Sequence, residues 1–303
     1  MTQAELPKIF HLQFTPEHWS QLTRLRALLG KPFPTTRESY QALDACLGHL
    51  RKYQVFAGIA DRIIPNLPKD REELDRYGSS RNLHSEEFGA LTEAMLCELY
   101  SSLDGLLDFF KAIYPTMQQL QKIRFASNFF QFAKEARLPA DFPEPIRIIL
   151  ATAYADWFEG LRSLRVEITH GTVGFFALDE KQETVTYFND GLSSTGQNVF
   201  HIKDILTVVR NFDNQVRVLF EGIAKFYVAQ LLPIPRMYTC GVYRGLIYIR
   251  VIEPSPDLNI NSGHCGSWDW FEQDPEKFCP LAKNCGAYTR KWPGGNVAAL
   301  KAV

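Results

Sequence analysis

The chain has 303 residues, of which 46% are hydrophobic and 22% are charged. This composition supports a packed core and an ordinary soluble surface, and it excludes a disordered or low-complexity chain. The 33 basic and 34 acidic residues leave a formal charge of −1, so affinity for nucleic acid would need a local basic patch. No apolar run approaches the roughly 20 residues that span a bilayer, and the first residues lack the features of a secretory signal. We therefore expect a cytoplasmic protein with no membrane partner.

The first 80 residues are expected to form an N-terminal helical extension. Thr15 is the expected cap of one helix. Thr35 and Glu38 have the spacing of a capping box, which predicts the start of a second helix. The polar stretch 68–73 is then expected to be a linker or an exposed turn.

Residues 81–235 are expected to form a bundle of four helices. In each expected helix, apolar residues recur every three or four positions along one stripe. These segments are 88–113, 117–137, 146–171 and 202–226. Between the third and the fourth, residues 173–188 have the pattern of a β-hairpin. Matching apolar stripes joined by mostly short links favour antiparallel packing of the helices.

The end of the third expected helix carries an Arg-x4-His pair, Arg165 and His170. Cleavage of RNA without metal needs a group that transfers protons and a cation that stabilises charge on the phosphate. Histidine titrates near neutrality and can act as acid or base. Arginine stays cationic and offers a planar fork of donors that matches phosphate oxygens. The expected substrate contacts near the pair are Arg162, Glu167 and Thr169.

An ordinary helix end explains the same residues in another way. A histidine just before a glycine is typical of a C-terminal cap, because a cation there complements the helix dipole. Glu159 and Arg162 have the spacing of a surface ion pair, and Arg165 could be solvated. Positions five apart on an ideal helix point about 140° away from each other. Both side chains of the pair therefore face one groove only if the helix unwinds near Gly171.

A bundle whose third helix delivers Arg-x4-His, followed by a β-hairpin and a fourth helix, resembles the HEPN superfamily. The resemblance covers roughly residues 85–232. The family includes toxins of toxin–antitoxin pairs, abortive-infection proteins and RNA-cutting CRISPR effectors. The resemblance implies that Arg165 and His170 are catalytic, while Val166 stands where the family often has Asn, Asp or His. It also implies a homodimer in which two such motifs face each other across a groove.

The function expected from this resemblance is a metal-independent endoribonuclease of the toxin or phage-defence type. It would cleave RNA by transesterification at the 2′-hydroxyl and would need no catalytic cofactor. The expected partners are RNA, a second copy of the chain and an antitoxin or regulatory protein. The alternative is a non-catalytic HEPN-like module that binds RNA or protein, or acts as a sensor.

Residues 236–303 are expected to form a small β-rich appendage that contains four of the six cysteines. In a reducing cytoplasm such a group more often binds metal than forms disulfides, and a structural zinc ion would stabilise a small domain. The candidate zinc ligands are Cys265, Cys279 and Cys285, with Cys240 or His264 as the fourth. Their spacings differ from the paired C-x2-C of most zinc modules, so free core thiols are the alternative.

Overall fold

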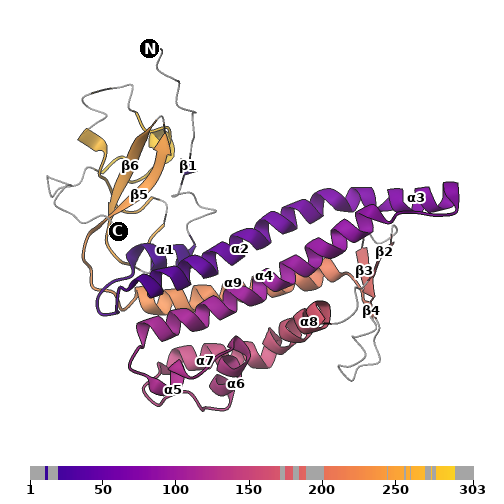
Figure 1. Ribbon diagram of the computed structural model, residues 1–303. Coiled ribbons are helices and arrows are strands. Elements are labelled where there is room, and N and C mark those ends of the chain that lie inside the picture. The colour runs from indigo at the N-terminus through magenta and orange to yellow at the C-terminus, as the bar shows by residue number, and fades with distance from the viewer. Residues whose placement is uncertain are drawn as a thin grey trace, which may run out of the picture. The chain divides into compact units, whose positions relative to one another are not determined.

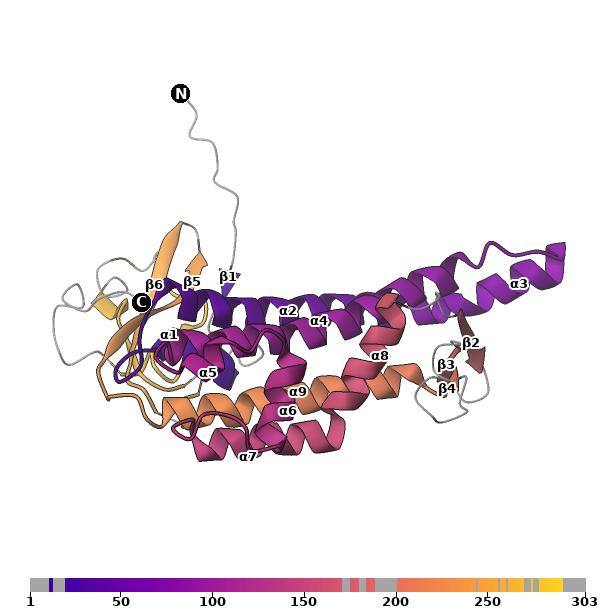
Figure 2. The ribbon, with the colours of Figure 1, turned by 60° about the horizontal axis from the view of Figure 1, so that its bottom comes forward.

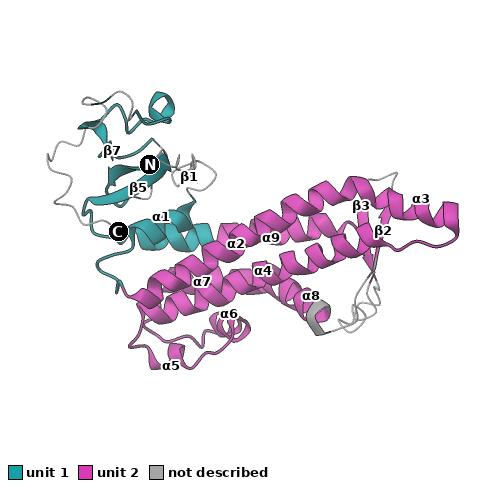
Figure 3. Cartoon of the chain, turned by 45° about the horizontal axis from the view of Figure 1, so that its top comes forward, with its two compact units in different colours: residues 1–35, 220–303 teal, residues 36–219 magenta. Residues whose placement is uncertain are grey.

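The computed structural model describes residues 11–12, 20–170, 175–179, 184–188 and 201–290, without 244, 256, 260, 270–273 and 275–277. The chain is mainly helical, with two small antiparallel sheets (Figure 1). Within the described residues, no helix is long and apolar enough to cross a membrane. Internal contacts divide the chain into a helical unit, residues 36–219, and a terminal unit, residues 1–35 and 220–303 (Figure 3).

The helical unit is built around two long helices that lie side by side, α2 (Arg37–Ile63) and α4 (Leu83–Ile113) (Figures 1 and 2). A Cβ added at Gly105 of α4 would meet the sulfur of Cys46 in α2 at 3.0 Å, so the absence of a side chain permits the close approach of the two helices. The apolar stripe predicted for α4 is confirmed. Its buried residues include Phe88, Leu99, Leu103 and Phe110.

The capping box of α2 is present but lies one residue from its predicted position. Thr36 is the N-cap, and its hydroxyl accepts a hydrogen bond from the backbone N–H of Ser39 at 3.2 Å. The Ser39 hydroxyl in turn accepts from the backbone N–H of Thr36 at 3.1 Å. The prediction of Thr35 and Glu38 was therefore wrong in register. A serine at the third helical position replaces the usual acidic partner.

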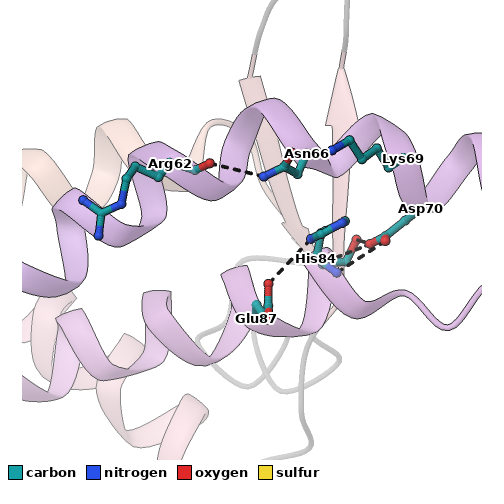
Figure 4. A network of polar contacts seen from close by, with 7 residues as sticks. Arg62, Asn66, Lys69, Asp70, His84 and Glu87 are labelled. Atoms are coloured by element: carbon teal, nitrogen blue, oxygen red, sulfur yellow. Dashed lines mark hydrogen bonds and ion pairs between the residues drawn. The ribbon is translucent and has the colours of Figure 1, made fainter.

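The polar stretch 68–73, predicted as a linker, is instead part of helix α3 (Leu67–Tyr77), which follows a short 3-10 turn, η1 (Ile64–Asn66). Asp70 of α3 is buried, and its carboxylate caps the start of α4 (Figure 4). It accepts hydrogen bonds from the backbone N–H groups of His84 at 3.3 Å and Ser85 at 2.8 Å. These contacts satisfy N–H groups that have no partner within their own helix.

Replacing Asp70 with alanine should lower the free energy of unfolding by about 1–2 kcal/mol, because two N–H groups of α4 lose their acceptor. Chemical denaturation followed by circular dichroism measures the change. The matched control is Asp75→Ala on the same helix, where the exposed carboxylate lies 3.9 Å from Arg71 and should contribute little. Equal effects of the two variants would contradict this role of Asp70.

The helix predicted over 117–137 is broken into two, α5 (Gln118–Gln121) and α6 (Ala126–Lys134). The break arises because Asp104 of α4 accepts a hydrogen bond from the backbone N–H of Ala126 at 3.2 Å and so starts a new helix. This contact joins residues that are far apart in the sequence, and no local pattern announces it.

The predicted third helix is confirmed as a continuous helical run with an irregular centre. It consists of α7 (Glu144–Ala153), a π-helical turn η2 (Tyr154–Phe158) and α8 (Glu159–His170). The predicted apolar stripe is buried at Ile146, Leu150, Ala153, Leu161 and Leu164. Trp157 is only half-buried, and the side chain of Ile168 lies outside the described residues.

The predicted β-hairpin is confirmed as strands β2 (Phe175–Asp179) and β3 (Thr184–Phe188), while its turn lies outside the described residues. A short strand, β4 (His201–Ile202), completes a sheet of order β2-β3-β4. The sheet packs on α4, where the ring of Phe176 meets that of Phe88 edge-on at 5.1 Å. The fourth predicted helix is α9 (Ile205–Val228), which begins after Ile202 because that residue pairs in β4.

The terminal unit combines α1 (Gln21–Leu28) and the end of α9 with a sheet of order β1-β5-β6-β7. The N-cap of α1 is Ser20, and Thr15, the predicted cap, lies outside the described residues. The β-rich character predicted for the tail is confirmed. The tail contributes the strands β5 (Arg236–Tyr243), β6 (Leu246–Ile252) and β7 (His264–Cys265) and the 3-10 turn η5 (Ala282–Asn284). The fourth strand of the sheet, β1 (His11–Leu12), comes from the N-terminal part of the chain.

The division into units differs from the expected domains of 1–80, 81–235 and 236–303. Residues 36–80 belong with the helical unit, since α2 packs along α4. The preceding segment belongs with the tail. The Arg236 guanidinium donates to the carbonyl of Leu29 at 2.7 Å, and the backbone N–H of Leu232 donates to the carbonyl of Lys31 at 3.0 Å.

Candidate functional site

Arg165 lies in the second half of α8, on the side that faces α4. Its guanidinium carbon is 5.3 Å from the centre of the Tyr100 ring. It also interacts electrostatically with Cys97 and Asp104. These three residues of α4 are spaced by three and four, so they share one face of that helix. The face holds the arginine in a defined position, half-buried between two helices.

Burial is the main influence on the pKa values of the three α4 residues around Arg165. Burial raises the pKa of the Asp104 carboxyl, while the N–H of Ala126 and the positive charge of Arg165 act in the opposite direction. Burial likewise raises the pKa of the Cys97 thiol and of the Tyr100 hydroxyl. Asp104 is the only one of these three α4 residues that is normally ionised at neutral pH. The charges of Asp104 and Arg165 therefore compensate each other at a partly buried position between the two helices.

The residues that flank Arg165 on α8 differ in their exposure and in their partners. Arg162 forms an ion pair with Glu159 at 3.1 Å, as its spacing predicted. Val166 is exposed and Glu167 is half-buried. The helix continues through His170 without a break, so the backbone does not unwind before that residue. The side chains of Thr169 and His170, and Gly171 itself, lie outside the described residues.

A separate hollow of about 720 Å³ lies between α3 and the hairpin β2–β3. Its lining includes Arg71, Asp75, Asp179 and Phe188. It is open and mixed in charge, and Arg165 takes no part in it. Nothing in the sequence pointed to this hollow, because it depends on α3, which was expected to be a linker.

The tail cysteines form the second candidate site. Cys240, Cys265, Cys279 and Cys285 all line one cavity of about 20 Å³, whereas His264 is not among its lining residues. The sequence thus correctly grouped the four cysteines. It missed Arg250, which lines the same cavity and donates to the sulfur of Cys285 at 3.0 Å.

Burial is the main influence on the pKa of three of these thiols. It raises the pKa of Cys240 to about 12 and that of Cys265 to about 11, and it also raises the pKa of Cys279. All six cysteines are present as free thiols. In the described part of the chain, no three His, Cys, Asp or Glu side chains are already arranged to hold a metal ion.

Comparison with known proteins adds no relative to this description. No protein-family model, no curated protein sequence and no solved structure matches the chain. The mainly helical fold and the two clusters around Arg165 and Arg250 are therefore the observations on which function must be argued.

Proposed function

We propose that the helical unit is a metal-independent endoribonuclease of the HEPN kind, with its active site at the end of α8. Arg165 binds the scissile phosphate and His170 transfers protons. The main support is the position of Arg165, which α4 holds through Tyr100 and Asp104 on the same helix that ends at His170. A cation held in a defined position and a residue type that can act as acid or base thus lie five residues apart on one helix. Because that helix continues through His170, the two side chains of one copy leave it about 140° apart, so one copy alone does not bring both to one groove.

The proposed reaction needs only these two kinds of group. The 2′-oxygen of a ribose loses its proton to a base and bonds to the adjacent phosphorus. The bond from phosphorus to the 5′-oxygen breaks, and an acid protonates that leaving oxygen. The products are a 2′,3′-cyclic phosphate and a 5′-hydroxyl. The guanidinium stabilises the charge that develops on the phosphate oxygens.

One Arg–His pair supplies a single histidine, whereas the reaction moves two protons. We therefore propose that the active form is a homodimer in which the ends of two α8 helices approach each other. Each copy would then contribute a histidine, one as base and one as acid. RNA is the substrate, and an antitoxin or regulatory protein would restrain the activity in a cell.

The test is incubation of the purified chain with total RNA in the presence of a chelator. We expect cleavage that survives chelation and leaves a 2′,3′-cyclic phosphate on the upstream fragment. Sedimentation or light scattering should show a dimer at working concentration. No cleavage under any condition, or a chain that remains monomeric, would refute the nuclease.

A non-catalytic RNA- or protein-binding module is the second candidate. One observation favours it, since Arg165 already contacts the Tyr100 ring and compensates Asp104. An arginine used in this way stabilises the packing of α8 on α4. In that case fluorescence anisotropy should show binding of intact RNA, with no cut products. The chain should also be expressed freely, without the growth arrest that a toxin causes.

A further inference from the structure

The four cysteines of the cavity come from separate parts of the terminal unit. Cys240 lies in β5, Cys265 in β7, and Cys279 and Cys285 lie on either side of the turn η5. The two strands that carry Cys240 and Cys265 both pair with β6. The fold therefore gathers thiols that are up to 45 residues apart in the sequence.

Each of the four sulfurs faces at least one N–H donor. The backbone N–H of Ser267 donates to the sulfur of Cys265, and that of Leu281 donates to the sulfur of Cys279. The Arg250 guanidinium donates to the sulfurs of both Cys240 and Cys285. A neutral thiol is a weak acceptor, while oriented N–H groups and cations stabilise a thiolate. These donors would therefore stabilise the sulfurs if they lost their protons.

Arg250 adds a second argument from charge. It is 2% exposed, and a guanidinium keeps its positive charge even when buried. A buried charge is costly unless opposite charge lies close to it. Its hydrogen-bond partners include the carbonyl of Ser262 at 2.8 Å and the thiol sulfurs. Its positive charge would stabilise these sulfurs if they were ionised, but several buried thiolates together require a further cation.

We propose that Cys240, Cys265, Cys279 and Cys285 bind one Zn²⁺ ion, with Arg250 donating to the sulfurs of Cys240 and Cys285. Four thiolates, one divalent ion and one guanidinium leave a net charge of −1. The four thiol protons pass to solvent as the ion binds. This chemistry is independent of the function proposed for Arg165, since it belongs to the terminal unit.

Zinc is the ion that fits this set of ligands. Four sulfurs in tetrahedral geometry are typical of structural zinc sites. The choice between Cys240 and His264 as the fourth ligand follows from the cavity, which Cys240 lines and His264 does not. Because the side chains as described do not yet form a ready set, binding would draw the sulfurs inward around the ion.

The first test measures metal in the full chain. We expect about one zinc ion per chain by elemental analysis. Cobalt substituted for zinc should give the intense visible bands of a tetrahedral thiolate site. Cys279→Ser should lose both signals. Cys46→Ala is the matched control, because Cys46 is buried in α2 of the helical unit, and it should retain both.

The second test concerns Arg250, whose role can be separated from that of the ligands. Arg250→Met should weaken zinc binding about 10- to 100-fold in competition with a chromophoric chelator, as for other groups that support metal ligands. Arg290→Met is the control, because Arg290 donates to the carbonyls of Gly263 and Asn261 rather than to sulfur. Equal zinc affinities of Arg250→Met, Arg290→Met and the unaltered chain would refute the role of Arg250.

The proposal fails if the unaltered chain, expressed with ample zinc, contains none and gives no thiolate bands with cobalt. It also fails if thiol titration of the unfolded chain shows that the tail cysteines are joined in disulfides. The first result would leave the cysteines as free thiols of the core, and the second would leave them as disulfides.

Discussion

His170→Ala should reduce the rate of RNA cleavage by about 10² to 10⁴, the range expected when a general acid or base is removed. The variant should keep the circular dichroism spectrum and the dimeric state of the unaltered chain. Arg165→Lys should also be impaired, because lysine keeps the charge but loses the two-point fork of donors. Initial rates on a labelled RNA of defined sequence, measured with a chelator present, give the comparison.

Two matched controls make this prediction sharp. His84→Ala removes a histidine near the start of α4, where its Nδ1 lies 3.6 Å from the carboxylate of Glu87. Arg210→Lys changes an exposed arginine of α9 that pairs with Asp61. Both controls should cleave RNA at the normal rate. If His170→Ala cleaves as fast as they do, the active site lies elsewhere in the chain.

Phe158→Ala should lower the free energy of unfolding of the helical unit by about 3–5 kcal/mol, as expected when a buried aromatic ring is removed. Phe158 closes the π-helical turn before α8 and is fully buried. Its ring stacks on that of Phe130 at 4.2 Å and lies 6.0 Å from that of Tyr100. The lost ring would leave a cavity at the point where α6, α4 and α8 meet.

The control for this variant is Phe125→Ala, since Phe125 is 62% exposed and should change stability by only about 0.5 kcal/mol. Urea denaturation followed by far-ultraviolet circular dichroism reports on the helical unit, which holds most of the helix. A loss for Phe158→Ala as small as that for Phe125→Ala would show that the aromatic stack is not a main source of stability.

The parts of the fold that the sequence predicted are those with a local signal. The apolar stripe of α4 recurs over many residues, and β3 alternates polar with apolar or aromatic residues, so the helix and the hairpin are found where expected. The errors concern contacts between distant residues. Asp70 reads as part of a polar linker, yet it is the buried cap of α4. The break before α6 depends in the same way on Asp104.

The candidate zinc site was likewise predicted only in the part that has a signal in the sequence. The crowding of four cysteines in the tail was visible in the sequence, and the fold brings these cysteines to one cavity. Arg250 was missed, although one signal was present. It is a charged residue between Ile249 and Val251 in a strand of otherwise apolar and aromatic residues. Such a residue is either exposed or paired within the core, and an expected cysteine cluster nearby favours the second.

The terminal unit is assembled from two segments, one that precedes the helical unit in the sequence and one that follows it. This order has a consequence for synthesis. A chain made from its N-terminus can complete the helical unit once residue 219 has emerged, because domains fold as units during translation. The buried face of α1, with Leu25 and Leu28, must then wait for the later segment of the same unit, residues 220–303. During that interval these leucines are open to chaperones or to premature association. Slow translation of residues 220–290 should therefore increase aggregation of the nascent chain more than slow translation of residues 36–219.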